Sequence, residues 1–152
     1  MPESHDTGKR DSEQSPPVIF ISYAQEDAEW KDLLLKHLHQ RALRELTETW
    51  NEEDISHGPE WYAELKDRLR NTRFAICLIS ANYLSSRFCV DEEIPYLLQE
   101  KSRRDLEIIP ILISECMWNR EPWLRGVKLY PDHDPKSGKA KNARWRLRRQ
   151  EA

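Results

Sequence analysis

Three consecutive carboxylates, residues 91–93, stand where a helix is predicted to begin. The run Phe74–Ile79 before them is short and apolar, which is typical of a strand buried on both faces. The polar stretch Ser80–Glu93 follows as a predicted loop, and apolar residues then recur at helical spacing, so a helix is predicted to begin near Asp91. In an open parallel sheet, ligands bind beyond the carboxyl ends of the strands. The sequence therefore predicts a ligand crevice at this loop, with carboxylates at its edge.

The carboxylates also have a simpler interpretation. Acidic residues at a helix start are favoured by the helix dipole alone, by about 0.3–1 kcal/mol each. Glu92 lies opposite the apolar stripe of the predicted helix, so periodicity by itself predicts only a solvated side chain there, and Glu93 is the reserve candidate. Pro95 disfavours a helical Ile94 and is expected to delay or kink this helix.

The elements that would position the crevice alternate between strand and helix. Val18–Ile21 is a predicted buried strand that ends in a polar turn of Ser22, Tyr23 and Ala24. Further along, the pattern predicts a helix from Asp27 to about Arg41, a strand at Leu46–Trp50, a helix at Trp61–Leu69 and a strand at Leu106–Ile113. Successive β-then-α steps predict an α/β fold, a doubly wound parallel sheet with helices on both faces.

The last strand contains a residue that conflicts with its predicted place. The apolar half of Leu106–Ile113 favours a central position in the sheet. Pro110 cannot donate a ladder hydrogen bond, which central strands rarely tolerate. A bulge is therefore expected at Pro110.

Composition limits the function classes. A chain of 152 residues with 38% hydrophobic residues and net charge −3 can build one core, and its charge favours neither a nucleic acid nor an anionic membrane as partner. No apolar stretch approaches a membrane span, so a soluble, cytoplasmic protein is predicted. The 3 cysteines form no CxxC pair and the 5 histidines show no ligand spacing, so no metal site is predicted.

Both ends of the chain differ from its middle. Residues 1–17 are polar and aperiodic and are predicted to be a disordered leader, with one domain at residues 18–152. Lys136–Arg149 carries basic residues without an acid. This segment is a patch for phosphate or an acidic partner, or else a solvated terminal helix or linker; the second interpretation is favoured.

Four stretches of the chain carry a family resemblance. They are Val18–Tyr23 with Asp27, Trp50–Ile55 with Gly58 and Trp61, Leu78–Ser86 with Phe88, Cys89 and Glu92, and Ile109–Ile111. In this order and spacing they resemble the successive boxes of a Toll/interleukin-1 receptor (TIR) domain of the bacterial kind, from about Val18 to Trp145. The resemblance implies a flavodoxin-like parallel sheet. It also implies that Trp50–Pro59 is the family's BB loop, which packs against other TIR domains and opens or covers the pocket.

The resemblance further implies cleavage of NAD, as substrate and without a cofactor, to nicotinamide and linear or cyclic ADP-ribose. The family's essential acid follows an aromatic residue by four positions, which here matches Phe88 and Glu92. Because nicotinamide leaves from a cationic pyridinium, no general acid is needed, and one carboxylate can stabilise the oxocarbenium charge on the ribose. The resemblance implies that Phe88 lines the pocket and that Ser22, Tyr23 and Ala24 form its opposite wall. It also implies that the region of Trp118 can complete the pocket of a neighbouring copy; plain packing of Trp118 is an equal alternative.

Two function classes follow. The first is an NAD glycohydrolase or cyclase activated by TIR self-assembly, in antiviral defence or cell suicide; the second is a scaffold for homotypic signalling contacts without turnover. Glu92 favours the enzyme, since a scaffold has no chemical need for it. In either case homo-oligomer contacts are expected at Asp54, Ile55 and Gly58. The family's usual last helix is not accounted for, which implies a longer protein with a C-terminal sensor module.

Overall fold

The computed structural model describes residues 16–40, 46–55 and 58–131. Its centre is one parallel sheet of four strands in the order β2-β1-β3-β4. The strands are β1 (Val18–Ser22), β2 (Glu48–Asn51), β3 (Phe74–Ile79) and β4 (Glu107–Leu112). The predicted doubly wound parallel sheet is confirmed. The predicted leader, apart from residues 16 and 17, and the basic segment Lys136–Arg149 lie outside the described residues.

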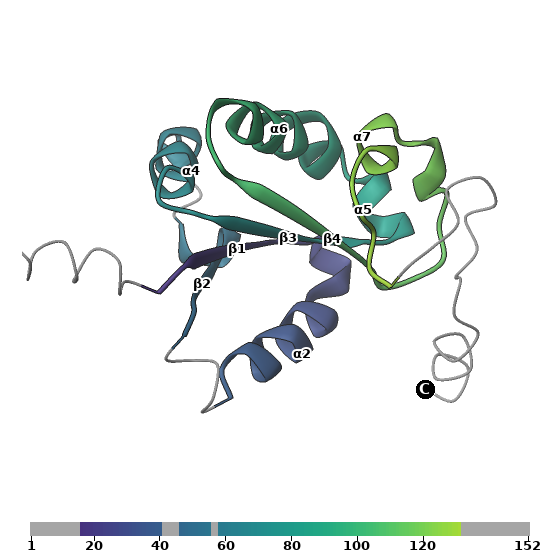
Figure 1. The fold of residues 1–152 in the computed structure, drawn as a ribbon, viewed down its shortest axis with the longest axis horizontal. Helices are drawn as coiled ribbons and strands as arrows, with labels where there is room; N and C mark the ends of the chain where they lie inside the picture. Colours follow the sequence, from purple (N-terminus) through teal and green to yellow (C-terminus); the bar gives the residue numbers. More distant parts are fainter. Residues whose placement is uncertain (1–15, 41–45, 56–57, 132–152) are drawn as a thin grey trace, which may run out of the picture.

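Helices lie on both faces of the sheet (Figure 1). Helix α2 (Ala28–Leu38) covers one face, while α4 (Trp61–Leu69), α5 (Ala81–Ser85), α6 (Ile94–Arg103) and α7 (Pro122–Arg125) lie on the other. Short 3-10 segments are η2 (Gln25–Asp27), η3 (Glu52–Asp54) and η5 (Trp118–Arg120), and a π-helical segment, η4 (Phe88–Glu93), precedes α6. No described helix is long and apolar enough to cross a membrane.

The core has two layers because alternate residues of each strand point to opposite faces. Phe20, Cys77 and Ile79 pack on the face under α4 and α6, whereas Ile21 and Leu78 pack on the α2 face. The predicted burial of β3 on both faces is confirmed, since five of its six residues are buried. This buried central strand sets the position of the segment that follows it.

The expectation of a central last strand with a bulge is wrong. β4 is an edge strand, and its register with β3 runs unbroken through the pair of Cys77 and Pro110. The carbonyl of Pro110 accepts a hydrogen bond from the Tyr130 backbone N–H at 2.9 Å, on the outer side of β4. The missing N–H of Pro110 faces the same outer edge, so the β3–β4 ladder loses no hydrogen bond and needs no bulge.

The stretch predicted as the loop Ser80–Glu93 is mostly helical. Ser80 caps α5, with its Oγ accepting a hydrogen bond from the Tyr83 backbone N–H at 2.9 Å. The main helix begins at Ile94 rather than near Asp91, with Pro95 in its first turn, where its missing N–H is one of those without an intrahelical partner. The segment between is π-helical, and this conformation decides which carboxylate turns inward.

Candidate functional site

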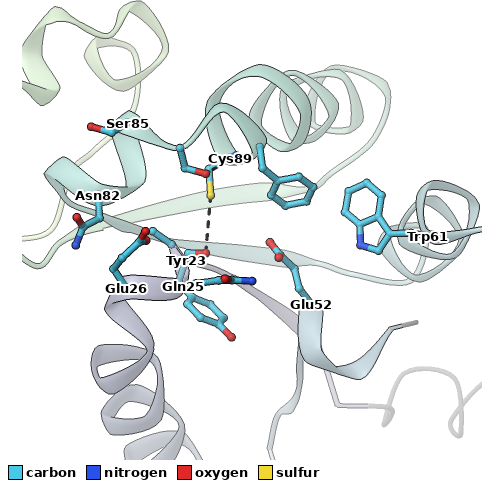
Figure 2. A pocket seen from close by; sticks show the side chains of 11 residues that line it. Tyr23, Gln25, Glu26, Glu52, Trp61, Asn82, Ser85 and Cys89 are labelled. Atoms are coloured by element: carbon cyan, nitrogen blue, oxygen red, sulfur yellow. Dashed lines mark hydrogen bonds between the residues drawn. The ribbon is translucent and has the colours of Figure 1, made fainter. Parts of the chain in front are cut away.

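A pocket of about 630 Å³ opens at the carboxyl end of the sheet. Its walls come from the ends of β1 and β2 and from the helical segment after β3 (Figure 2). The residues that line it are Tyr23, Ala24, Gln25, Glu26, Glu52, Trp61, Asn82, Ser85, Ser86, Phe88 and Cys89. This volume lies within the range of small-molecule sites in proteins. The crevice predicted from strand order is therefore present.

One side of the pocket is aromatic. The rings of Trp61 and Phe88 meet edge to face, with their centroids 4.8 Å apart at 60°. Both side chains line the pocket and are half-buried. Such rings can hold a flat heterocycle by stacking or edge contact. The predicted place of Phe88 at the pocket agrees with this geometry.

Behind the pocket wall, Glu93 is completely buried. Ser22 Oγ donates a hydrogen bond to Glu93 Oε1, and the Tyr83 hydroxyl lies 2.7 Å from Ser22 Oγ. Since the Ser22 proton is used by Glu93, Tyr83 is the donor to Ser22. A chain of hydrogen bonds thus runs from α5 through β1 to the π-helical segment.

The second carboxyl oxygen of Glu93 is less well satisfied. Among the described residues, neither Glu93 Oε2 nor Glu52 Oε1, both buried, has a hydrogen-bond donor. Burial raises the pKa of Glu93 well above its ordinary value, and the hydrogen bond and negative charge of Glu52 raise it further, while Ser22 opposes this. A proton on Glu93 allows that carboxyl to donate to Glu52.

The π-helical turn explains why Glu93, and not Glu92, is buried. An α-helix would place the residue four positions after Phe88 on the side of Phe88, which is Glu92. A π-helix closes its hydrogen bonds over five residues, and so Glu93 takes that place while Glu92 is exposed. Neither Glu92 nor Glu93 lines the pocket. The role of Glu92 as the acid stays a prediction.

Comparisons with known proteins identify the family. The model of the TIR domain family matches residues 19–146. The chain belongs to the TIR domain family. It is 26% identical to the uncharacterized protein y4lF of Sinorhizobium fredii over 70% of this chain and 33% of that protein. It is 29% identical to the disease resistance protein RPS6 of Arabidopsis thaliana over 63% of this chain and 8% of that protein.

Solved structures agree on the fold. The TIR domain of the Toll-related receptor TRR-2 from Hydra magnipapillata matches with a TM-score of 0.58 and 22% identity, over 88% of this chain and 95% of that chain. The TIR domains of the activated Roq1 resistosome, which recognizes the pathogen effector XopQ, match with a TM-score of 0.53 and 21% identity, over 69% and 63% of the two chains. The chain spans a third or less of the curated relatives' length.

Of the three residues predicted to form the opposite wall, Tyr23 and Ala24 line the pocket, whereas Ser22 does not and instead donates to the buried Glu93. Their contact with a substrate stays a prediction. The Tyr23 hydroxyl donates to Glu53 Oε1 at 2.9 Å, and burial, followed by this contact with Glu53, raises the pKa of Tyr23. Tyr23 is therefore a neutral wall residue that also ties the pocket to η3.

Trp118 does not reach this pocket. Its side chain is 2% exposed and packs in the core layer with Leu124 and Leu129. Its proposed contribution to a pocket stays a prediction.

The three residues predicted to mediate assembly differ in exposure. Asp54 is exposed, although its carboxylate caps the Asn51 backbone N–H at 2.9 Å. Gly58 is exposed and has no atom within 4 Å of the position that a Cβ would take. Ile55 is 3% exposed and packs in this chain's own core. Contacts with a second copy at these residues stay a prediction.

Several pocket residues carry no motif signal that points to them. Gln25, Glu26 and Asn82 belong to segments that the sequence predicted to be near the crevice, but nothing in their spacing separates them from solvated residues. Glu52 was hidden among the acids of the loop after β2. Among the described residues, no group of three His, Cys, Asp or Glu side chains could hold a metal ion. The site thus offers carboxylates, hydroxyls and aromatic rings for its chemistry.

Proposed function

We propose that this TIR domain cleaves the N-glycosidic bond of NAD, giving nicotinamide and linear or cyclic ADP-ribose. The observation that carries the proposal is Glu93, a completely buried carboxyl that does not itself line the pocket but interacts with Glu52, which does. Burying a carboxylate costs free energy unless the group is paired and fully hydrogen-bonded. A buried acid with a raised pKa beside a cleft is therefore typical of a functional site. The family resemblance supplies the substrate.

The reaction requires few protein groups, because its leaving group needs no proton. The bond between the ribose carbon and the pyridinium nitrogen breaks, and its electron pair stays on nicotinamide, which leaves neutral. Ionised Glu93 would stabilise the positive charge that develops on the ribose, and Phe88 and Trp61 would hold the departing ring. Water then adds to the ribose carbon and loses a proton to the carboxylate, or a base nitrogen of the adenine adds and gives the cyclic product.

Assembly and context complete the proposal. The pocket is bounded by η3 and α4 on one side, next to the exposed Asp54 and Gly58, where a second copy can approach. Assembly of TIR domains is supported by the Roq1 resistosome, and a defence role by the name of RPS6. Relatives longer than the chain support a further sensor module in the same protein.

Turnover of NAD by the purified protein tests the proposal. NAD consumption and products are followed for the protein free in solution and crowded on beads, with Glu93→Gln, Glu92→Gln and the exposed Glu60→Gln as matched variants. We expect crowding to raise turnover, Glu93→Gln to abolish it, and Glu60→Gln to leave it unchanged. Loss of turnover in Glu92→Gln alone would return the role to Glu92. No turnover by any protein on beads would reject the enzyme.

A non-enzymatic scaffold is the second candidate, and one observation favours it. The raised pKa of Glu93 favours its neutral form in the described conformation, and a neutral carboxyl does not stabilise a cation. A scaffold would form concentration-dependent oligomers in light scattering without consuming NAD. Oligomers of equal size in wild type and Glu93→Gln, with no turnover in either, would establish it.

A further inference from the structure

We propose that Glu52 is a positioning residue that holds Glu93 covered and neutral by sharing one proton with it, and that loss of this proton uncovers the charged acid. The inference rests on the proposed function, because it explains how a buried Glu93 becomes the acting carboxylate. Glu52 belongs to η3 and Glu93 to η4, on opposite sides of the pocket entrance. A shared proton therefore forms a hydrogen bond between the segment after β2 and the helical segment after β3.

Within the described residues, each of the two carboxyls has a buried oxygen without a donor, and Glu52 acts on Glu93 through a hydrogen bond and its charge. Glu52 lines the pocket and its Oε1 is buried without a donor among the described residues, as is Oε2 of Glu93. The other oxygen of Glu93 is held by Ser22. Figure 2 shows the Glu52 carboxyl rising from η3 into the pocket, across from Cys89, which lies on the same segment as Glu93. Glu52 thus lines the pocket, whereas Glu93, with which it interacts, does not.

Within the described part of the chain, no cation contributes to the pKa shift of Glu93, so none offsets two ionised carboxylates there. The titratable and polar groups that face Glu93 are Ser22 from β1, Cys77 from β3, Tyr83 from α5, Cys89 from its own segment and Glu52 from η3. Burial raises the pKa of Cys77, Tyr83 and Cys89, so these three are neutral. Lys31 instead pairs with Asp32 at 2.7 Å and Glu53 at 3.5 Å.

Two carboxyls in one site cannot both ionise cheaply, so they bind one proton between them. With the proton, Glu93 donates to Glu52 and the loop is held over the acid. Without it, two like charges repel, Glu52 turns outward and Glu93 faces the pocket as a carboxylate. A cationic ring in the pocket favours the second state because it lies against the negative pair, and the proton leaves to solvent.

The direction of the pH effect on stability follows from linkage. The folded protein holds a proton on Glu93 that the unfolded chain releases near the ordinary value of 4.5. The folded state therefore binds more protons above that pH, and its stability falls as pH rises from there through the raised pKa of Glu93. Replacing Glu52 by Gln removes the like charge, so this fall should become shallower and the Glu93 titration should move down by about one unit.

The test uses two measurements on the full chain, one of them independent of activity. Free energies of unfolding in urea between pH 4 and pH 8, with the Glu93 carboxyl titrated by ¹³C NMR, are compared for wild type, Glu52→Gln, Glu52→Asp and the exposed Glu60→Gln. We expect Glu52→Gln to lower the Glu93 titration, Glu52→Asp to restore it and Glu60→Gln to match wild type. An unchanged titration in Glu52→Gln overturns the shared proton, whatever the activity.

The second measurement is the pH profile of NAD turnover on beads. Glu52→Gln should move the acidic side of the pH profile to lower pH by about one unit. At pH values where Glu93 of the wild type is still protonated, turnover should therefore rise about tenfold. A merely structural role would instead lower turnover at every pH, and that result overturns the proposal. If Glu52→Gln fails to fold, Glu52→Ala removes the same charge, and the Glu93 titration is read in that variant instead. A lowered titration without turnover in any protein keeps the proton pair and rejects the proposed enzyme.

Discussion

Asp27 and Glu93 are two buried carboxylates at the same edge of the sheet, and they differ in their partners. Asp27 accepts hydrogen bonds on both oxygens, from Ser80 Oγ and, at 3.0 Å, from Asn82 Nδ2. Within residues 16–40, 46–55 and 58–131, Glu93 has a donor on one oxygen only, and its other oxygen is buried without one, while the Glu52 carboxyl acts on it. An acid with donors on both oxygens stabilises the corner between β1 and β3. A buried acid that lacks a donor on one oxygen is instead a candidate for a functional group.

The largest expected effect follows from removing the ionisable group of Glu93. Glu93→Gln should lower NAD turnover by two orders of magnitude or more, since one preorganised group at a developing charge contributes that much. Its stability should fall little, because Gln is neutral, of similar size and able to donate to Glu52 as a protonated Glu93 does. Turnover on beads and urea unfolding measure the two effects. Retained turnover would remove Glu93 from the chemistry.

The opposite result is expected at Asp27. Asp27→Ala leaves the Ser80 hydroxyl and the Asn82 amide without their acceptor, so the free energy of unfolding should fall by about 1–3 kcal/mol. Urea denaturation measures the loss, and the exposed Asp67→Ala is the control. A loss at Asp27 no larger than at Asp67 would show that the corner does not depend on this carboxylate.

The two acids should also differ in pH dependence. Wild-type stability should fall as pH rises above the ordinary glutamate value of 4.5 towards the raised pKa of Glu93. Glu93→Gln should remove this fall, because nothing then titrates at that place. Thermal unfolding at closely spaced pH values measures this loss of stability. A fall that persists in Glu93→Gln would mean that another group titrates.

The smallest expected effect is at Ser22, which lowers the pKa of Glu93 by donating to it. Ser22→Ala should raise that pKa, moving the acid limb of turnover to higher pH, in the direction opposite to Glu52→Gln. The lost hydrogen bond should cost about 1 kcal/mol of stability. The ¹³C titration of Glu93 checks the direction. A shift to lower pH would contradict the hydrogen-bond geometry.

The sequence predicted some parts of this site well because local patterns decide them. β3 was predicted at its observed bounds, since six apolar residues in a row are typical of a strand buried on both faces. The crevice followed from the order of parallel strands, and the acidic stretch 91–93 was placed at its edge. The edge position of β4 was missed, because the outer neighbour Tyr130 that satisfies the Pro110 carbonyl lies far along the chain.

By itself the sequence determined the alternating elements, the parallel sheet, the TIR family and the edge where the acids gather, because hydrophobic spacing and motif order are local properties. Only the tertiary structure decided which acid is buried. The choice between Glu92 and Glu93 depends on a π-helical turn, which is a matter of hydrogen-bond register rather than of side-chain type. The meeting of Glu93 with Glu52 likewise depends on how β2 and β3 lie on either side of β1, so that segments distant along the chain converge at one edge.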